Sequence, residues 1–284
     1  MNILTFDIEE WFHLLDNPST RTEAEWGRYE TRIYRNMDRI FQLLDETNTR
    51  ATFFCLGWVA DKHPDVIRRI DAAGYEIGTH SYAHQLAYEQ TPSEFRADLV
   101  RSIRHLQDLT GKPIRAYRAP GFSIKAHNRW VFPILLEEGI EVDCSVFAAR
   151  RAHGGDVSLA LHTPGYLSVD GALLKEFPMN TAALLGRDLV FSGGGYFRLL
   201  PYRAIQGMMR RSDYVMTYFH PRDFDAGQPM IPGLSRVRQF KSYYGLAGCW
   251  AKLRHLLTEF PFVDVAEAER QVDWISLKRR PVTA

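Results

Sequence analysis

The stretch Tyr75-Glu76-Ile77-Gly78-Thr79-His80-Ser81-Tyr82-Ala83-His84 joins a short apolar segment, typical of a buried strand, to two histidines. Because His80 and His84 are four residues apart, their rings can point the same way and hold one metal ion. A histidine pair at this spacing also occurs on ordinary solvated surfaces. The metal interpretation therefore depends on the segments before and after this stretch.

The chain around it alternates between short apolar strands and amphipathic helices, most of them separated by glycine or proline. This rhythm predicts an α/β protein with a mostly parallel sheet, and both an open sheet and a barrel satisfy it. From about residue 146 to 200 the rhythm fails, and long loops are expected. The predicted strands are 3–6, 51–54, 75–77, 114–118, 142–144, 214–218 and 260–265; the predicted helices are 28–46, 64–73, 92–110, 127–138 and 241–258.

Polar and ionisable side chains follow five of these strands. In α/β proteins chemistry gathers at the carboxyl ends of the strands, so these side chains are expected to meet. Such a coincidence favours an active site over a purely structural explanation. The candidates are Asp7, Glu9, His80, His84, Arg118, Asp143 and His220.

A hydrolase with one metal ion needs two or three protein ligands, a general base and a general acid. His80, His84 and one carboxylate would supply the ligands. Asp7 and Glu9 are two residues apart in an extended segment, so they face the same side. One of them could bind the metal while the other acts as the base.

Composition sets limits on other functions. The chain has 284 residues and a formal net charge of +1, so no overall field favours nucleic acid. Its three cysteines (Cys55, Cys144 and Cys249) are far apart and predict reduced thiols. The first residues lack the pattern of a signal peptide, and no apolar run is long enough to span a membrane, so a cytoplasmic location is expected. The basic residues Lys278-Arg279-Arg280 leave open a peripheral membrane contact.

In combination, several of these motifs resemble the polysaccharide deacetylases, carbohydrate esterase family four. The motifs are Thr5-Phe6-Asp7, His80-Ser81-x-x-His84, Arg118-x-Pro120, Asp143 and Phe219-His220, in this order. Other strings are similar to a bacterial subgroup associated with exopolysaccharide and surface-glycan loci. They are Phe177-Pro178, the run from Gly193 to Pro201, and Tyr218-Phe219-His220-Pro221-Arg222.

The resemblance implies a distorted (β/α) barrel, a divalent metal ion (most readily zinc), and removal of N-acetyl groups from amino sugars. It implies one deacetylase domain over residues 1–284, in which about 221–284 is a C-terminal extension packed on the barrel. The substrate would be an N-acetylated glycan, or a lipid-linked or nucleotide-linked sugar. The resemblance implies that Asp7 is the general base and that Arg118 is its partner. It implies that His80 and His84 are metal ligands. His220 would be the general acid with Asp143 as its partner, and a backbone N–H near Gly121 would bind the oxyanion.

Two positions depart from the family pattern. Position 8 is Ile8 where the family usually has a metal-binding aspartate, and the period-two argument favours Glu9 as the substitute, with Glu10 as the alternative. Gly121 stands where many relatives have an aromatic residue, and Phe122 could partly replace it. Aromatic residues beside the motifs are candidate sugar-stacking groups: Trp11, Tyr82, Phe122 and Tyr196.

Three functions remain open at this point. The first is a metal-dependent N-deacetylase acting on a cell-surface polysaccharide or its precursor. The second keeps the metal site but acts on a formylated sugar or a cyclic imide. The third is a glycan-binding protein that lost activity when Ile8 replaced a ligand, although a binding protein has no need for both a base and an acid.

Overall fold

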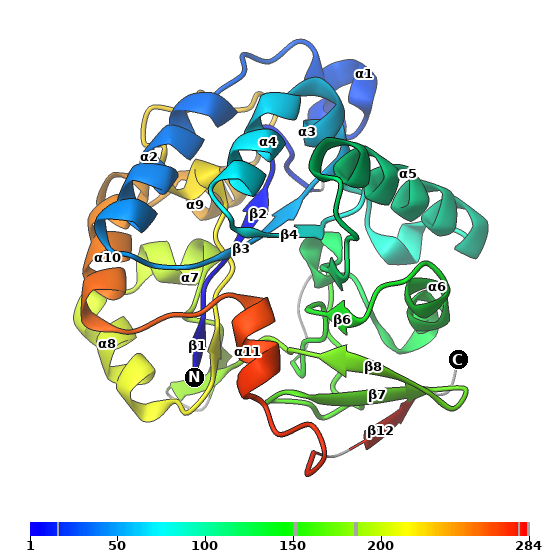
Figure 1. The fold of residues 1–284 in the computed structure, drawn as a ribbon. Helices are drawn as coiled ribbons and strands as arrows, with labels where there is room; N and C mark the ends of the chain where they lie inside the picture. The colour runs from blue at the N-terminus through cyan, green and yellow to red at the C-terminus, as the bar shows by residue number, and fades with distance from the viewer. Residues whose placement is uncertain (16, 150–152, 185–186, 278, 283–284) are drawn as a thin grey trace.

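The fold is built on parallel strands that lie side by side at the centre of the molecule (Figure 1). The computed structural model describes residues 1–284 except 16, 150–152, 185–186, 278 and 283–284. Register is set by buried residues, with Phe6 opposite Phe53 and Phe53 opposite Ile77. In order across the sheet, the parallel strands are β2 (Thr5–Ile8), β3 (Thr52–Cys55), β4 (Glu76–Thr79), β5 (Ala116–Tyr117), β6 (Val142–Asp143) and β8 (Ala172–Glu176).

The sheet curls into a distorted (β/α) barrel. β1 (Asn2–Ile3) runs parallel to β11 (Val215–Met216), and Phe219 forms a bridge to Phe6 on β2. On the other side of β11, side-chain hydrogen bonds reach the segment that follows β8. Tyr214 Oη donates to the Pro178 carbonyl over 2.7 Å, and the Met216 N–H donates to Asn180 Oδ1 over 2.9 Å. The predicted α/β class is confirmed. Of the two forms that the sequence allowed, an open sheet and a barrel, the structure has the barrel.

The region from 146 to 200 is more ordered than the sequence predicts. β7 (Gly165–Val169) and β8 form an antiparallel hairpin, which the turn Asp170-Gly171 allows because both residues have a positive φ. β9 (Ala182–Leu184) pairs with β10 (Arg187–Leu189), and α7 (Gly194–Leu199) and α8 (Tyr202–Arg211) follow. The expectation of long loops was therefore wrong from Gly165 onward, whereas the described residues from 146 to 164 contain no helix or strand.

The C-terminal region also differs from the prediction. The expected strand at 260–265 reduces to one bridge between Val263 and Ile3, and α11 (Val265–Gln271) begins immediately after it. β12 (Arg279–Val282), which the sequence did not predict, lies parallel to β7. Arg279 and Arg280 thus belong to a strand, and Lys278 lies outside the described residues. The boundary of an extension at 221 stays a prediction.

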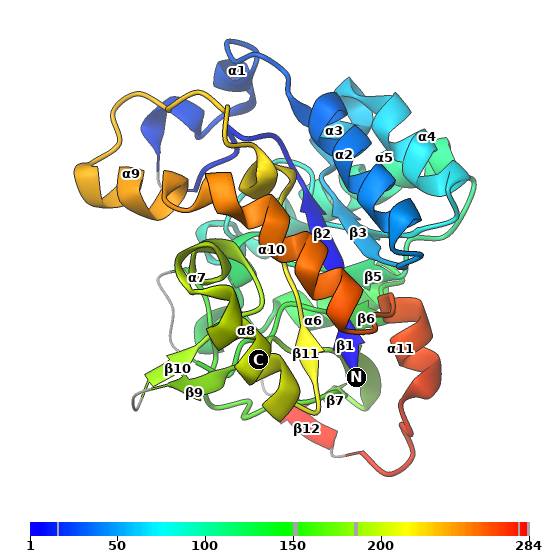
Figure 2. The ribbon, with the colours of Figure 1, turned by 90° about the vertical axis from the view of Figure 1, so that its left-hand side faces the viewer.

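Helices lie outside the strands (Figures 1 and 2). The predicted capping box is present, since Thr91 and Glu94 bond reciprocally at the start of α5. Within the described residues, no helix combines the length and the apolar character needed to cross a membrane. The remaining α-helices are α1 (Glu23–Trp26), α2 (Ile33–Glu46), α3 (Gly57–Lys62), α4 (Pro64–Ala72), α5 (Pro92–Thr110), α6 (Val131–Glu137), α9 (Arg236–Tyr243) and α10 (Leu246–Glu259).

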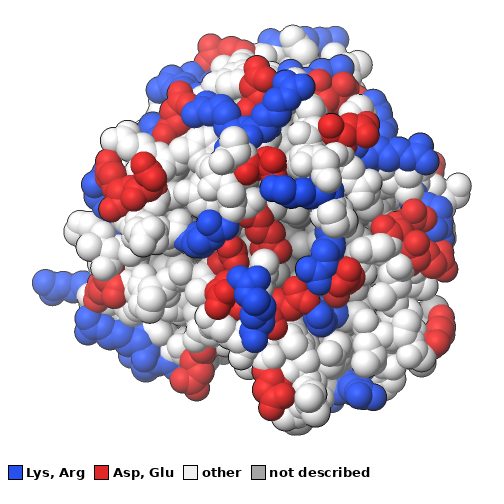
Figure 3. Space-filling model, viewed as in Figure 1, with Lys and Arg blue, Asp and Glu red and all other residues white. Residues whose placement is uncertain are grey.

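A continuous apolar core joins the sheet to these helices. Phe6 and Phe53 stack with ring centroids 5.4 Å apart, and Leu253 and Leu256 of α10 are buried in the same cluster. Burying each such side chain stabilises the fold by about 1.5–3 kcal/mol. Cys55, Cys144 and Cys249 are buried and unpaired, as predicted. On the face shown in Figure 3 the two signs of charge are intermixed.

Candidate active site

The loop after β4 carries both predicted histidines. His80 donates through Nδ1 to the Arg118 carbonyl over 2.7 Å, which leaves Nε2 available to a ligand. Ser81 and His84 both have a left-handed backbone, with φ of 67° and 50°. Non-glycine residues adopt this conformation at a cost of about 1–3 kcal/mol and keep it only where neighbours enforce it. The loop is therefore held in a strained shape that presents the two rings.

Asp98 on α5 supplies part of that enforcement. Its Oδ1 accepts the Tyr82 N–H over 2.8 Å, and its Oδ2 accepts the Ala83 N–H over 2.9 Å. The Ser81 carbonyl accepts from Ser102 Oγ over 2.9 Å. The sequence analysis missed Asp98, because a carboxylate on a predicted helix gives no sign of the loop that it contacts.

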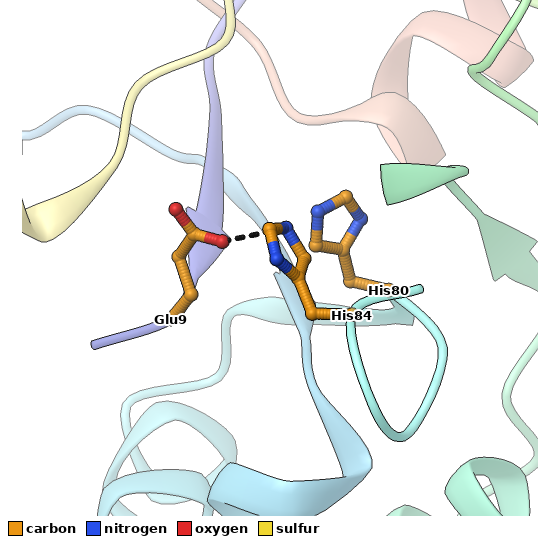
Figure 4. A group of neighbouring side chains, drawn as sticks. All are labelled: Glu9, His80 and His84. Carbon is orange, nitrogen blue, oxygen red and sulfur yellow. Dashed lines mark ion pairs between the residues drawn. The ribbon is translucent and has the colours of Figure 1, made fainter. Parts of the chain in front are cut away.

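Glu9 completes a group of three potential metal ligands (Figure 4). One ligand atom each from Glu9, His80 and His84 lie within 4.8 Å of one another, and Glu9 Oε2 is 2.7 Å from His84 Nε2. Burial alone would raise the pKa of Glu9, but the charges of His84 and His220 outweigh it and lower that pKa to about 2. Burial lowers the pKa of His80 to about 4.

An anionic carboxylate and a neutral imidazole are the forms that metal ligands require. Glu9 Oε2 is buried, and the His84 Nε2 atom lies 2.7 Å from it. The donor set of two histidines and one carboxylate is typical of zinc enzymes. The residues present therefore fit a divalent metal ion.

Glu10, the alternative ligand, points elsewhere. Its carboxylate accepts from the backbone N–H groups of Arg32 and Ile33, over 2.9 and 3.1 Å, and from Thr31 Oγ1 over 2.7 Å. These donors lie at the start of α2, where Arg32 provides no side-chain cap. Glu10 thus fixes the beginning of that helix at residue 33 rather than 28.

Asp7 and Arg118 form a buried ion pair beside the ligand group. Arg118 Nη1 donates to Asp7 Oδ1 over 2.8 Å and to Thr5 Oγ1 over 2.6 Å. The arginine is fully buried and also packs over the Phe54 ring, with 4.2 Å from Cζ to the centroid. Because the bond occupies Oδ1, the Asp7 Oδ2 atom remains directed toward His220. The predicted pairing of these two residues is present.

His220 approaches the same place from the segment after β11. Its Nε2 is 3.8 Å from Asp7 Oδ2 and 3.8 Å from Glu9 Oε1, and its side chain is partly exposed. Its Nδ1 donates to Asp223 Oδ2 over 3.0 Å. Burial opposes a proton on His220, but Glu9 and Asp223 raise its pKa to about 9.

Asp223 is held in turn by its surroundings. It also accepts the His220 backbone N–H, and its Oδ1 is 3.5 Å from Arg198 Nη1. Despite burial, Arg198 and His220 hold the pKa of Asp223 well below its usual range. The sequence analysis missed this residue, although the spacing of three from His220 across Pro221 is typical of a capped turn.

Asp143 is not the partner of His220, so that prediction was wrong. Asp143 Oδ1 accepts from Ser145 Oγ over 2.6 Å, and Ser145 Oγ accepts the Ala119 N–H over 2.8 Å. The other close group is Glu176, whose carboxyl pKa burial and Asp143 raise well above its usual range. Asp143 lies at the end of β6 and supports the backbone next to Arg118.

The candidate sugar-stacking residues divide into two groups. Trp11 is only 3% exposed and donates to the Glu30 carbonyl; Tyr82 is 1% exposed and bonds to Asp61. Neither presents a ring face to a ligand, so these two assignments were wrong. Phe122 and Tyr196 are accessible, and Phe122 packs edge-on against Tyr218 with centroids 5.2 Å apart.

Gly121 and Phe122 both have a positive φ, of 60° and 53°, in the turn that follows Arg118. A Cβ at position 121 would lie 2.7 Å from Leu15 Cδ1. The positive φ therefore favours glycine at position 121, and a larger residue there would also have to displace the end of the Leu15 side chain.

A cavity of about 400 Å³ lies beside His84. Its wall includes Leu15, Trp26 and Leu86, and an ion pair between Arg21 and Glu89 borders it over 3.5 Å. The mixture of apolar and polar groups is typical of a ligand pocket.

Comparison with known proteins agrees with this geometry. A family model described as polysaccharide deacetylase matches residues 28–132, and one described as a domain of unknown function (DUF3473) matches 144–269. A peptidoglycan-N-acetylglucosamine deacetylase of Bacillus cereus is 33% identical over 124 residues, 43% of this chain and 45% of that protein. A chitin deacetylase of Colletotrichum lindemuthianum is 33% identical over 97 residues, 31% of this chain and 38% of that protein. The chain thus spans less than half the length of these relatives.

The fold is also found among solved structures. A Mycobacterium smegmatis protein provisionally named a polysaccharide deacetylase superposes with a TM-score of 0.66 and 21% identity, over 99% of this chain and 93% of that one. At this identity the likeness concerns the fold alone. Over residues 28–132 the chain matches the polysaccharide deacetylase family model, and the curated relatives make it similar to the polysaccharide deacetylases, carbohydrate esterase family four.

Proposed function

We propose that the protein is a metal-dependent hydrolase that removes N-acetyl groups from amino sugars of a cell-surface polysaccharide or its precursor. The observation that carries this proposal is the position of His220 Nε2, 3.8 Å from both Asp7 Oδ2 and Glu9 Oε1. A candidate acid, a candidate base and a candidate metal ligand thus border one small space. Amide hydrolysis needs these three functions together.

Asp7 would act as the general base. Its carboxylate would take a proton from the water molecule whose oxygen bonds to the acetyl carbon. Arg118 holds the carboxylate in one orientation through the 2.8 Å bond. The buried arginine is thus a positioning residue for the base.

His220 would act as the general acid. With its pKa raised to about 9 it carries a proton at neutral pH, and Nδ1 is occupied by Asp223. The proton on Nε2 would pass to the amide nitrogen as the C–N bond breaks. The products are acetate and a free amino sugar.

Glu9, His80 and His84 would hold the metal ion. Zinc is the identity that this donor set favours. When bound, the ion would supply Lewis-acid activation of the amide group. Both the presence of the metal and its identity are parts of the proposal.

The substrate class follows from the relatives and from the site. The similar curated proteins are named as deacetylases of peptidoglycan and chitin, both polymers of N-acetylated sugars. Tyr196 and Phe122 offer accessible rings, and the cavity beside His84 offers polar contacts. A lipid-linked or nucleotide-linked sugar and a cytoplasmic location stay predictions from the sequence.

The test is an assay of acetate release from chitooligosaccharides and peptidoglycan fragments, combined with metal analysis of the purified protein. Wild type is expected to hold about one divalent ion per chain and to release acetate. Asp7→Asn is expected to retain the ion and lose activity, whereas His80→Ala loses both. Absence of acetate from every N-acetylated substrate, or release of formate from formylated sugars instead, would contradict the proposal.

A further inference from the structure

A row of large apolar side chains is exposed on α9. Val237, Phe240 and Tyr244, the last of these just after the helix, are 64%, 53% and 52% exposed. Their spacing of three and seven residues places them on one side of the helix, and the rings of Phe240 and Tyr244 are 4.7 Å apart. Isolated apolar residues are normal at a protein surface, but contiguous ones mark an interaction site. We call these three residues the α9 patch.

The helix is fixed to the protein by its other side. Arg198 of α7 donates to the carbonyls of Lys241 and Ser242, over 2.8 and 2.7 Å. Tyr243 Oη accepts the Ile231 N–H over 2.8 Å. Figure 2 shows α9 at the periphery of the molecule, above α7. The patch therefore faces outward on a helix that is anchored in place.

The chain segment that carries the patch has charge of one sign. Residues 226–258 contain five lysines and arginines and no aspartate or glutamate. Arg236 and Lys241 flank the apolar row and are exposed. Among the described residues, neither forms an ion pair with a carboxylate.

We propose that the α9 patch binds a lipid surface that carries anionic headgroups. Aliphatic and aromatic side chains would enter the interface, while Arg236 and Lys241 would meet the headgroups. A second copy of the chain is a poorer occupant, because a symmetric contact would set these cations against each other. A sugar polymer could stack on Phe240 and Tyr244, but it would leave the exposed aliphatic Val237 and the flanking cations without a matching partner.

The patch lies close to the candidate active site. Arg238 Nη2 donates to the Leu15 carbonyl over 2.8 Å, and Leu15 lines the cavity beside His84. Arg198, which anchors α9, also contacts Asp223. Binding through α9 would therefore bring the opening of the site toward the lipid surface. This placement suits a substrate glycan that is attached to a membrane. That part of the inference rests on the proposed function.

The experiment is flotation of the full chain with vesicles of phosphatidylcholine, with and without about one third phosphatidylglycerol. Wild type is expected to float with the anionic vesicles, and less as the salt concentration rises. Phe240→Ser is expected to reduce partitioning by about tenfold through lost apolar burial. Lys241→Gln is expected to reduce it by about fivefold on anionic vesicles alone.

Ile275→Ser is the matched control, because Ile275 is 97% exposed but lies between α11 and β12, outside the patch. It is expected to partition like wild type. Acetate release from a soluble oligosaccharide by Phe240→Ser is expected to match wild type, which shows that the fold is intact. Vesicle binding does not depend on catalysis. A protein that releases no acetate would refute the proposed function, and the vesicle experiment would still test lipid binding.

Three results would overturn the inference. The first is absence of vesicle binding by wild type, and the second is equal binding by Phe240→Ser and wild type. The third is a dimer, measured by light scattering, or co-sedimentation with an N-acetylated polymer, that Phe240→Ser abolishes while vesicles remain unbound. The α9 patch would then be an interface for that other partner.

Discussion

The Asp223 carboxylate accepts two hydrogen bonds from His220, from the imidazole Nδ1 and from the backbone N–H, each over 3.0 Å. The two residues are joined by a single turn that begins at Pro221. The bond from Nδ1 directs the proton on that nitrogen toward Asp223, and Nε2 faces Asp7. Asp223 thus acts on the reaction through another residue, as a positioning group.

Asp223→Asn is expected to lower kcat by about 10- to 100-fold with little change in KM. His220 must be protonated to act as the acid, and its pKa is raised to about 9 partly by Asp223. Without the negative charge that pKa falls, so activity should decline at a lower pH than in wild type. The pH profile of kcat for acetate release measures this, and an alkaline limb that stays in place would contradict the role of Asp223.

Asp143→Asn is expected to leave the alkaline limb of the same profile unchanged. Asp143 bonds to Ser145, which holds the Ala119 N–H, and not to His220. Its substitution should instead lower stability, by about 1–3 kcal/mol for a disturbed buried hydrogen bond. Thermal unfolding and the pH profile together test this. If the alkaline limb of the kcat profile shifted as far as in Asp223→Asn, Asp143 would be a partner of His220, as the sequence predicted.

Glu9→Ala and Glu10→Ala are expected to fail in different ways. Glu9 lies with the two histidines, so its removal should lower metal affinity by at least about 10- to 100-fold. Glu10 accepts backbone N–H groups at the start of α2, so its removal should keep the metal and cost about 1–2 kcal/mol of stability. Metal analysis and thermal melting separate the two. Metal loss confined to Glu10→Ala would show that the ligand is misassigned.

Asp98→Asn is expected to weaken metal binding without touching a ligand. An amide group cannot accept from both Tyr82 and Ala83 N–H groups, because its nitrogen is a donor. The loop that places His80 and His84 should loosen, with about 10-fold lower affinity. Asp108→Asn, on the exposed side of the same helix, is the matched control. Equal metal affinity in Asp98→Asn and wild type would exclude this supporting role.

The sequence predicted the parallel strands other than β8 and β12, and the residues at their ends, because both rest on local patterns. Apolar runs marked the strands, and polar residues directly after them are placed by the strand direction. The preference for Glu9 over Glu10 came from the same period of two. The structure places Glu9 with the histidines and Glu10 at a helix start.

The errors concern contacts that depend on tertiary structure. Trp11 and Tyr82 are adjacent in sequence to site residues but face the core, which adjacency does not reveal. Asp143 was paired with His220 by analogy, whereas a local turn supplied Asp223. The hairpin of β7 and β8 was missed because its strands lack a continuous apolar run.

The closure of the barrel through Tyr214 and Asn180 has a consequence for motion. Two side-chain hydrogen bonds and one backbone bond, from the Tyr218 N–H to the Ser192 carbonyl, hold this seam in place of a longer ladder, so amide hydrogens along it should exchange with solvent early. The strands that carry Asp7, His80, Arg118 and His220 are joined to one another by backbone pairing on the other side of β11. The wall can therefore open at its seam while the catalytic groups keep their mutual distances.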